Sequence, residues 1–305
     1  MLKPISFVII TYNRPNDMLA LVKNIATLHR ADELLQEVII VNNASTADYT
    51  ETKNFIKTHP NLPFNFIDSH ENLGVAKGRN FAVKHSTGKY LIMLDDDAEM
   101  GNPDCLESLL KEFEQQSGSR ETAIISFRVE YFDTRKIQSN AFPHKELERH
   151  KDLERFETYY FAGGAHAIRR DLFLQMGGYP VDFFYGMEEY DLSYRLIDAG
   201  YAIRYAGKVL MLHKESPLGR SSKKEKLAML WINKSKVAWR YLPIQYFWST
   251  AVMWSIEYLR KTQFDLFGFI KGWKEVLSIR HEEKRKEINK NTLAYLRSVR
   301  ARLWY

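Results

Sequence analysis

The chain has a single cysteine, Cys105, among its 305 residues. One cysteine excludes an intramolecular disulfide and fits a reducing compartment. The apolar run within residues 1–10 is too short for the core and cleavage site of a signal peptide, so we interpret it as a first strand. These absences predict a cytoplasmic protein.

Two common phosphate-binding patterns are also missing. The segment Glu71–Asn80 (ENLGVAKGRN) has neither the GxxxxGK[ST] spacing of a P-loop nor the GxGxxG spacing of a dinucleotide site. Its glycines at 74 and 78 still lie beside Lys77 and Arg79, so the segment could bring backbone and a cation to a diphosphate at a helix start. A solvated basic helix start is the alternative.

No apolar run is long enough for an unambiguous membrane span. The strongest candidate, Leu242–Leu259, contains a proline, a glutamine and a glutamate, and a spanning helix needs about 20 predominantly apolar residues. Three interpretations stay open: a helix lying on the membrane surface, a helical subdomain packed on the rest of the chain, or an oligomer contact.

Charge and tryptophan are distributed unevenly. Residues 1–213 hold 24 Lys and Arg against 30 Asp and Glu, whereas residues 214–305 hold 20 against 8 and contain all six tryptophans. This shift predicts an N-terminal domain over 1–213 and a basic, Trp-rich helical region over 214–305. The basic region lacks a recognised nucleic-acid motif and its charges alternate with apolar runs, so we do not expect nucleic acid as a partner.

Before residue 214, short apolar runs alternate with amphipathic stretches. This rhythm predicts an α/β fold with a mostly parallel sheet and helices on both faces. The expected strands are 5–10, 37–41, 64–67 and 90–94, and the expected helices are 16–28 and 74–85.

The fourth expected strand, Tyr90–Leu94 (YLIML), ends in three consecutive carboxylates, Asp95, Asp96 and Asp97. The strand has no polar face, as expected for a central strand whose carboxyl end meets a ligand. Three adjacent anions repel one another, which indicates a bound Mg²⁺ or Mn²⁺. A solvated acidic turn is the alternative.

Polar side chains also follow the first two strands. Loops at adjacent carboxyl ends form the crevice in which a nucleotide can lie, although turns use the same residue types for structural reasons. These residues are Thr11, Tyr12, Asn13, Arg14 and Asn42.

The order of these motifs resembles inverting family 2 nucleotide-sugar glycosyltransferases with the fold called GT-A. The resemblance spans roughly residues 5–213 and is carried by FVIITYNRP, VNNAS, ENLGVAKGRN, YLIMLDDD, GGAHAIRR, GGYP, GMEEYDLSYRLIDAGY and His213. It implies a Rossmann-like nucleotide-binding half, here with a C-terminal helical extension, and a divalent cation, Mn²⁺ or Mg²⁺, as cofactor.

The resemblance also assigns roles to residues. It implies that Asp97, Asp95 and His213 hold the metal ion, which in turn bridges the diphosphate of the donor. It implies a nucleotide pocket formed by Thr11, Tyr12, Asn13, Arg14, Asn42, Asn72, Gly78, Arg79, Asp95 and Asp96. Gly163, Gly164 and His166 would line the pocket for the donor sugar and the acceptor.

The resemblance further implies that Glu189 is the base that deprotonates the acceptor hydroxyl, with Glu188 and Asp191 orienting it. Relatives commonly have aspartate at the position of Glu189. Without the resemblance, three carboxylates in a first helical turn would be interpreted as favourable partners of the helix dipole.

One residue departs from the family pattern. Where relatives commonly have an aspartate that accepts a hydrogen bond from the nucleotide base, this chain has Asn42, whose amide oxygen accepts more weakly. We expect transfer from a nucleoside-diphosphate sugar, with UDP first and dTDP second, to a glycan or lipid-linked glycan, in the cytoplasm or on the inner membrane face. A nucleotidyltransferase and a non-catalytic binding protein are the alternatives. Oligomeric state stays open.

Overall fold

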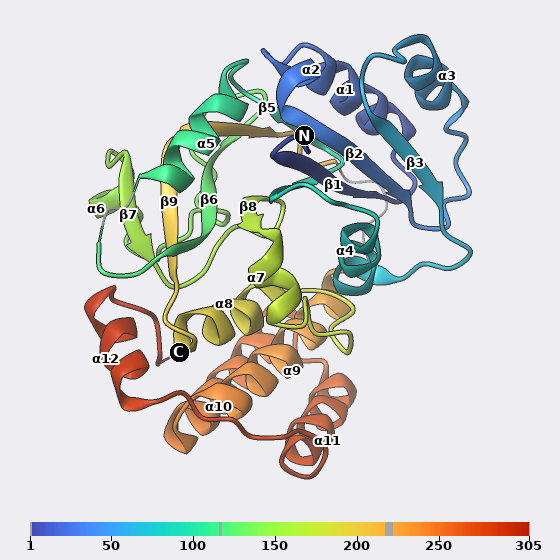
Figure 1. Cartoon of the computed structure of the whole chain (residues 1–305). Coiled ribbons are helices and arrows are strands. Elements are labelled where there is room, and N and C mark those ends of the chain that lie inside the picture. The colour runs from blue at the N-terminus through green and yellow to red at the C-terminus, as the bar shows by residue number, and fades with distance from the viewer. Residues whose placement is uncertain (1, 116–117, 217–221, 305) are drawn as a thin grey trace.

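The structure is a computed structural model that describes residues 2–115, 118–216 and 222–304. Its N-terminal half alternates strands with helices, as expected from the sequence (Figure 1). The elements are β1 (Ile5–Thr11), α1 (Pro15–Ala26), α2 (Ala31–Leu34), β2 (Leu35–Asn42), α3 (Thr50–Thr58), β3 (Phe64–Asp68), α4 (Gly74–Lys84) and β4 (Tyr90–Asp95).

Further strands and helices follow β4. They are β5 (Ala98–Met100), α5 (Cys105–Glu114), β6 (Thr122–Tyr131), α6 (Leu147–His150), β7 (Arg155–Thr158), β8 (Ala165–Arg169), α7 (Arg170–Gln175), α8 (Glu188–Asp198) and β9 (Ala202–His213). Four helices complete the chain: α9 (Lys223–Tyr241), α10 (Ile244–Lys261), α11 (Leu266–Glu282) and α12 (Lys290–Ser298).

The described strands form one sheet in the order β3-β2-β1-β4-β8-β6-β9-β5, with β7 paired to β9. β3, β2, β1 and β4 are all parallel, as the sequence predicts. Beyond β4 the sheet is mixed, because β8 runs antiparallel to both β4 and β6 while β6 and β9 are parallel. The parallel half carries its polar loops at one edge, and β8 brings a further loop to that edge.

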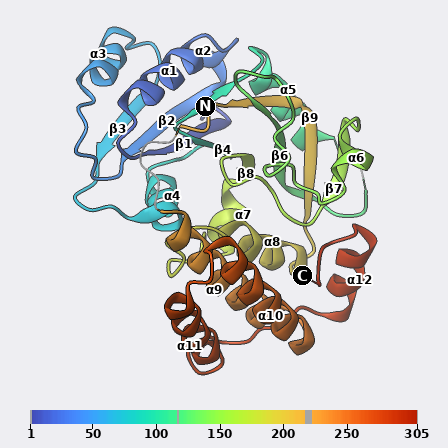
Figure 2. The same ribbon diagram turned by 180° about the vertical axis from the view of Figure 1, so that it is seen from behind.

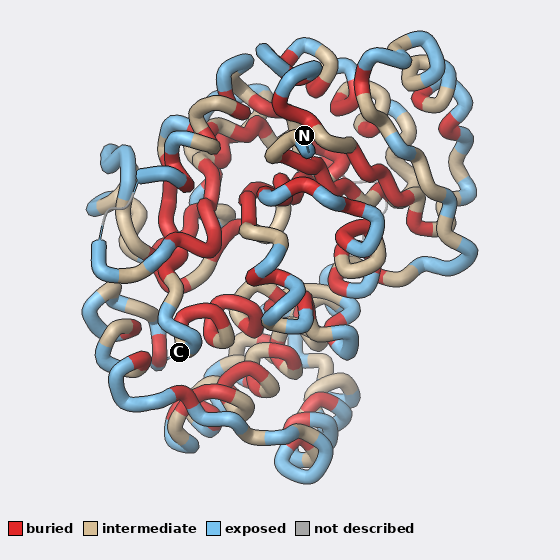
Figure 3. The backbone as a smooth tube through the Cα atoms, in the orientation of Figure 1, coloured by how far each residue is buried: buried red, intermediate tan, exposed pale blue. Residues whose placement is uncertain are grey.

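Each face of the sheet has its own hydrophobic core. Successive residues of β1 alternate between the two, with Phe7 and Ile9 in one core and Val8 in the other, as the twofold repeat of a strand requires. Helices α1 and α5 cover the first face, and α4, α7 and α8 cover the second. In Figure 3 the buried backbone accordingly runs through the centre of the sheet.

The C-terminal helices continue the second core. Trp231 of α9 is fully buried and donates from its indole N–H to the Ala251 carbonyl at 3.0 Å. Figures 1 and 2 show α9, α10 and α11 beneath α8, on the side of the molecule away from β1 to β3. The buried side of these helices therefore packs on the rest of the chain, which is one of the three interpretations left open by the sequence. The domain boundary at residue 214 stays a prediction.

Local sequence explains where these helices begin. Ser222 and Glu225 form a reciprocal capping box at the start of α9, and the side chains of Asp265 and Asn289 cap α11 and α12. Within the described residues, no helix combines the length and apolarity that crossing a bilayer requires.

Candidate functional site

The three consecutive carboxylates at the end of β4 point in different directions. Asp95 forms an ion pair with Arg79 at 2.8 Å, whereas Asp96 and Asp97 are buried after the strand ends. The chain turns directly after Asp95, and Asp96 contacts Thr11 while Asp97 contacts His213, so the three adjacent anions serve three separate positions.

Asp95, Asp97 and His213 form a candidate metal centre. One ligand atom from each lies within 4.8 Å of the others. His213 Nε2 lies 3.3 Å from Asp97 Oδ1, while its Nδ1 lies 2.8 Å from Gln138 Oε1. Because an amide oxygen only accepts, Nδ1 donates to Gln138, and Nε2, which faces Asp97, is the nitrogen that would coordinate a metal after losing its proton. Two carboxylates and an imidazole suit Mn²⁺, and the carboxylates suit Mg²⁺.

The protein balances the charge on Asp97. Burial opposes ionisation, but the hydrogen bond from His213 and the nearby Arg14 guanidinium hold the pKa of Asp97 below its usual range. The same contact raises the pKa of His213 against the effect of burial. Asp97 Oδ2 also accepts from the Ser216 N–H at 2.9 Å. Asp97 is thus kept as an anion, the form that binds a cation.

Asp96 braces the loop after β1. Its Oδ2 accepts from the Thr11 hydroxyl at 2.7 Å, and its Oδ1 pairs with Arg14 at 2.7 Å. Burial raises the pKa of Asp96 to about 6, although Arg14 and Thr11 oppose the rise. Thr11 and Asp96 are both buried and hydrogen-bonded to each other, so they support the predicted nucleotide pocket from behind. Tyr12 and Arg14 are partly exposed beside them.

Asn13 and Asn42 fix the loop after β2. Asn13 has a left-handed backbone (φ 56°), and its side-chain oxygen accepts from the N–H groups of Thr46 and Ala47. Asn42 accepts from the Ser45 N–H at 3.1 Å and donates to Asp68 at 2.8 Å. The amide that replaces the usual aspartate therefore has a carboxylate neighbour on β3.

The start of α4 lies against the same loop. Asn43 donates to Asn72 at 2.9 Å and accepts from the Leu73 N–H at 2.9 Å. A Cβ on Gly78 would lie 3.3 Å from Ile10, so a small residue lets α4 approach β1 closely. This approach places Arg79, which is 3% exposed, directly over Asp95.

Two glutamates open α8 on the opposite side of Arg79. Glu188 is buried, with Oε1 3.6 Å from Arg79, and its Oε2 has no hydrogen-bond partner. Burial raises the pKa of Glu188 despite Arg79, and burial together with the neighbouring Glu188 raises the pKa of Glu189 to about 8. A carboxyl group tuned toward neutrality and next to a metal centre is typical of a general base.

Gly163 and Gly164 connect the two carboxylate groups. A Cβ on Gly163 would lie 2.0 Å from Glu189 Oε1, and a Cβ on Gly164 would lie 2.1 Å from Asp95 Oδ2. Neighbouring Cα atoms are about 3.8 Å apart, so Glu189 and Asp95 meet adjacent residues of one backbone segment. Any side chain at either glycine would fill the space that the carboxylates occupy.

Two predicted site residues lie elsewhere. His166 is fully buried in β8, with Nδ1 3.0 Å from the Ala162 carbonyl and Nε2 2.9 Å from the Tyr179 hydroxyl. Both ring nitrogens are occupied, and burial lowers its pKa well below the usual value. The structure therefore places His166 in the core behind the pocket and not on its surface.

Asp191 is also separate from the other carboxylates. Its two oxygens pair with Arg195 at 2.6 Å and with Arg240 at 2.8 Å, and one of them accepts from the Tyr241 hydroxyl at 2.9 Å. Arg240 and Tyr241 belong to α9, so Asp191 attaches the C-terminal helices to α8. The contacts show this attachment and no contact with Glu189.

A second group of potential ligands does not fit a metal. His144, Glu146 and His150 lie close together. However, Nδ1 of His144 accepts from the Glu146 N–H at 3.1 Å, so its Nε2 carries the proton that faces the Val299 carbonyl at 3.2 Å. His144 has no lone pair left for a cation.

Sequence reasoning missed residues that surround Glu189. Tyr160 and Tyr190 stack with ring centroids 4.7 Å apart, and Lys234 lies 5.4 Å from the Tyr190 ring and 4.7 Å from that of Trp254. Burial lowers the pKa of Lys234 to about 8, the charge of Arg302 lowers it too, and Glu189 opposes this. Lys234 lies in α9 and Arg302 lies in the segment after α12. Neither belongs to a sequence motif that would have indicated a site residue.

Comparison with known proteins identifies related sequences. A sequence model described as "Glycosyl transferase family 2" matches residues 6–177. An uncharacterized protein of Haemophilus influenzae is 29% identical over 178 residues, which are 58% of this chain and 92% of that protein. The uncharacterized glycosyltransferase YwdF of Bacillus subtilis is 29% identical over 180 residues, 58% of this chain and 62% of its own length.

Solved structures share the fold at low sequence identity. GalNAc-T7, determined with UDP, GalNAc and Mn²⁺, is 16% identical with a TM-score of 0.67, covering 99% of this chain and 58% of that chain. The mannosyltransferase PcManGT of Pyrobaculum calidifontis, in complex with GDP-Man and Mn²⁺, is 17% identical with a TM-score of 0.59, covering 98% and 79%. S. aureus TarS 1–349 is 15% identical with a TM-score of 0.59, covering 95% and 82%.

Proposed function

This chain belongs to glycosyl transferase family 2, and from that premise we propose that it is a metal-dependent inverting enzyme acting on a nucleoside-diphosphate sugar. The chain is a glycosyltransferase, and the predicted GT-A fold is confirmed by its likeness to solved glycosyltransferases. The donor, the acceptor, the stereochemistry and the roles of single residues form the proposal.

The observation that carries the proposal is the pairing of two carboxylates across Gly163 and Gly164. Asp95 belongs to the candidate metal centre, and Glu189 is the half-buried carboxyl with a raised pKa. A donor whose diphosphate lay at Asp95 and Asp97 would present its anomeric carbon toward Glu189. Inverting transfer needs this arrangement, since the leaving group and the base act on opposite faces of the sugar.

The proposed reaction is a single displacement. The acceptor oxygen forms a bond to the anomeric carbon, the bond between that carbon and the diphosphate oxygen breaks, and Glu189 takes the acceptor proton. Arg79 would hold the diphosphate side of the site, because it faces both Asp95 and Glu188. A divalent cation held by Asp95, Asp97 and His213 would supply Lewis-acid stabilisation of the departing diphosphate.

We propose UDP as the first donor carrier and dTDP as the second. Structures of GalNAc-T7 and TarS contain UDP, and PcManGT contains GDP-Man, so the fold accommodates more than one base. Asn42 together with Asp68 would face the base in this chain. The acceptor is proposed to be a hydroxyl of a glycan or lipid-linked glycan.

The outer side of the C-terminal helices supports a location on an anionic membrane surface. α10 exposes apolar residues four positions apart, and α11 exposes Phe267 and Ile270 beside Lys271 and Lys274. No carboxylate of the described residues pairs with either lysine. Apolar side chains flanked by free cations complement a surface of anionic lipid headgroups. The α10 residues are Ile244, Trp248, Val252 and Ile256.

The decisive experiment is thermal unfolding with UDP, dTDP, GDP or CDP, each with and without Mn²⁺. A ligand at about 100 times its dissociation constant adds about 2.7 kcal/mol. We expect one diphosphate to stabilise the protein only with metal, and Asp97→Ala to abolish the effect. Asp152→Ala removes an exposed carboxylate and is the matched control. If no diphosphate stabilises the protein under any condition, the binding-protein alternative replaces this proposal.

A further inference from the structure

The two glycines at 163 and 164 are held in place by hydrogen bonds to the residue before them. The N–H of Ala162 donates to the Ser126 hydroxyl at 3.1 Å, and the Ala162 carbonyl accepts from Nδ1 of His166 at 3.0 Å. Ser126 belongs to β6 and His166 to β8. Two strands of the sheet therefore fix Ala162, and a shift of this residue would move both glycines relative to the carboxylates that they touch.

The hydrogen bonds of His166 define its tautomer. A carbonyl oxygen only accepts, so Nδ1 carries the proton that faces Ala162. Burial keeps the imidazole neutral by lowering its pKa well below the usual value, which leaves Nε2 as an acceptor. The Tyr179 hydroxyl lies 2.9 Å from Nε2 and donates to it, since the other neighbour of this hydroxyl, Met93 Sδ at 3.4 Å, is the weaker acceptor. The ring therefore cannot turn without breaking a buried hydrogen bond.

Tyr179 is fixed in turn by α4. Its N–H donates to the Asn80 side-chain oxygen at 2.9 Å, and the Asn80 amide donates back to the Tyr179 carbonyl at 2.8 Å. The residue before Asn80 is Arg79, which pairs with Asp95 at 2.8 Å and lies 6.0 Å from the centre of the Tyr179 ring. These neighbours form a closed path that leaves Asp95 through Arg79 and returns through His166 to the glycines.

We propose that His166 and Tyr179 are a positioning pair that holds the two glycines in the place that the base, Glu189, requires. The inference rests on the proposed function, because it names the groups that set the surroundings of that base. His166 and Tyr179 are 0% and 1% exposed, so they act through the backbone at Ala162 and not on the substrate. Asp95 stays paired to β1, so a shift of the glycines would disturb Glu189 more than the donor diphosphate.

Two amide variants of His166 distinguish this role from a general contribution to packing. The amide nitrogen of asparagine is as many bonds from Cβ as Nδ1 is, and that of glutamine is as many as Nε2 is. His166→Asn can therefore keep the hydrogen bond to Ala162, whereas His166→Gln can keep only the one to Tyr179. Both variants replace a buried ring with an amide, so a purely structural role would affect them alike.

The first measurement is the release of UDP from UDP-glucose and from UDP-N-acetylglucosamine, with Mn²⁺ and with water as the acceptor. We expect His166→Gln to lower kcat about 100-fold, the effect of a displacement of roughly 1 Å, and His166→Asn to stay within about threefold of wild type. Tyr179→Phe keeps the ring and should lower kcat about tenfold, the effect of one lost hydrogen bond. The KM for the donor should change by less than about twofold in all three variants.

The second measurement is hydrogen exchange of the segment 161–167, which needs no substrate. The N–H groups of Ala162 and Ala165 are both hydrogen-bonded in this segment, so loosening it accelerates their exchange. We expect exchange to be at least about tenfold faster in His166→Gln and Tyr179→Phe, and close to the wild-type rate in His166→Asn.

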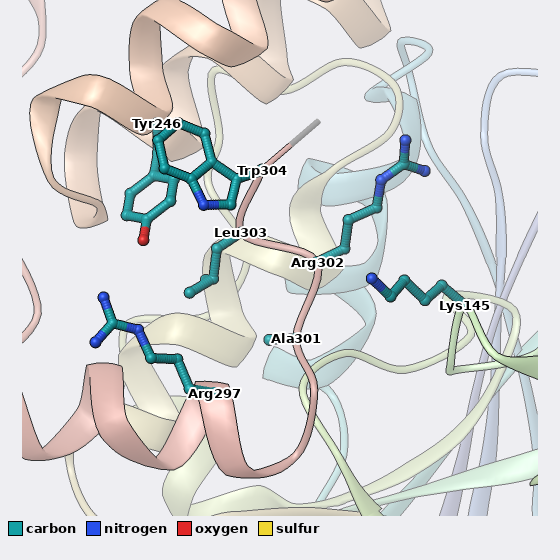
Figure 4. Close-up of a pocket in the computed structure, with 7 residues that line it drawn as sticks. All are labelled: Lys145, Tyr246, Arg297, Ala301, Arg302, Leu303 and Trp304. Carbon is teal, nitrogen blue, oxygen red and sulfur yellow. The ribbon is translucent and has the colours of Figure 1, made fainter.

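Tyr246 provides the matched control. Like Tyr179 it is a buried tyrosine, but it lies in α10 and lines a cavity of about 290 Å³ near the end of the chain (Figure 4). None of the residues that line this cavity belongs to the path described above. Tyr246→Phe also removes one hydroxyl from a buried ring, and both kcat and the exchange of 161–167 should stay within about twofold of wild type.

The outcomes separate the positioning pair from the proposed function. Equal losses of kcat in the two amide variants, or wild-type kcat in a folded Tyr179→Phe protein, would overturn the positioning role. A wild type that releases no UDP and is not stabilised by UDP with Mn²⁺ would overturn the proposed function instead. Exchange then decides the positioning pair alone, and equal exchange in His166→Gln and His166→Asn would overturn it.

Discussion

A methyl group on Gly163 would lie 2.0 Å from Oε1 of Glu189, closer than any non-bonded contact allows. Any side chain at position 163 would therefore have to displace the Glu189 carboxylate. Glu189 takes its orientation from backbone that it touches directly.

Gly163→Ala should consequently displace Glu189 and lower kcat by about 100-fold, the effect of a misplacement of roughly 1 Å. Affinity for the donor should change little, because Asp95 faces the next residue. Steady-state kinetics with donor and acceptor varied separately measure this. Gly207→Ala is the matched control, since a Cβ there meets neighbours at 3.3 Å or more. A Gly163→Ala enzyme with wild-type kcat would show that Glu189 is not held by this contact.

The pH dependence of kcat should report Glu189. Burial and the adjacent Glu188 raise its pKa to about 8, and a base acts only when it is ionised. Activity should therefore rise with pH through this region and fall as pH decreases below it. Glu188→Gln removes the repelling charge, which lowers the pKa of Glu189 and should move the rising limb to lower pH. The profiles are measured at saturating donor, acceptor and metal.

Glu189→Gln should lose activity by about 10²- to 10⁴-fold, as expected for a general base. The residual activity should no longer rise with pH in the region where Glu189 ionises in the wild type. A variant that keeps its turnover and its limb would remove Glu189 as the base.

Replacing Asp191 should lower the stability of the protein and leave catalysis nearly unchanged, the reverse of the effect expected at Glu189. Its carboxylate is 2% exposed and is shared by Arg195, Arg240 and Tyr241. Asp191→Ala removes one carboxylate partner of each arginine, but Arg240 keeps Asp182 and Glu283. Arg195 keeps two backbone carbonyls, so the loss should be about 1–3 kcal/mol of unfolding free energy. The kcat of the enzyme that remains folded should stay near wild type. Urea unfolding with parallel kinetics separates the two effects, and Glu275→Gln, an exposed carboxylate of α11, is the control. A stable but inactive variant would restore the catalytic role expected from the sequence.

The parallel half of the sheet was predictable because its signals are local. Apolar runs give the strands, and the polar residues after Thr11, Asn42 and Leu94 follow at strand ends. The antiparallel pairing of β8 was not predictable, because strand partners distant in sequence leave no local pattern. The burial of His166 could have been predicted from the sequence. It lies in the short apolar run of β8, where it is paired with Met93 of β4.

The candidate site was predictable only where a motif marks it. The structure brings Gly163 against Glu189 and Gly164 against Asp95, whereas the roles that the resemblance assigns to these residues stay predictions. Lys234, Arg302 and Gln138 reach the site through tertiary packing of helices and loops with ordinary compositions. No spacing rule connects them to Glu189 or His213.

Asn42 and Asp68 face each other as partners on β2 and β3. Asn42→Asp would replace a 2.8 Å hydrogen bond with two facing carboxylates, which should lower the unfolding free energy by about 1 kcal/mol. The double variant with Asp68→Asn should recover this loss. Urea titrations of the single and double variants give the coupling directly. If Asn42→Asp alone is as stable as wild type, Asp68 does not explain the departure from the family residue.

The exposed apolar face of α11 should determine membrane binding. Phe267 is 82% exposed and Ile270 is 69% exposed, so their burial in lipid would contribute about 1.5–3 kcal/mol each. Wild type should float with vesicles containing anionic lipid and less with neutral vesicles, because Lys271 and Lys274 flank the apolar residues. Phe267→Ser with Ile270→Ser should weaken vesicle binding at least tenfold. Leu174→Ser with Val181→Ser, which removes exposed apolar residues elsewhere, should leave it unchanged. Equal flotation of the two double variants would exclude this face as the membrane contact.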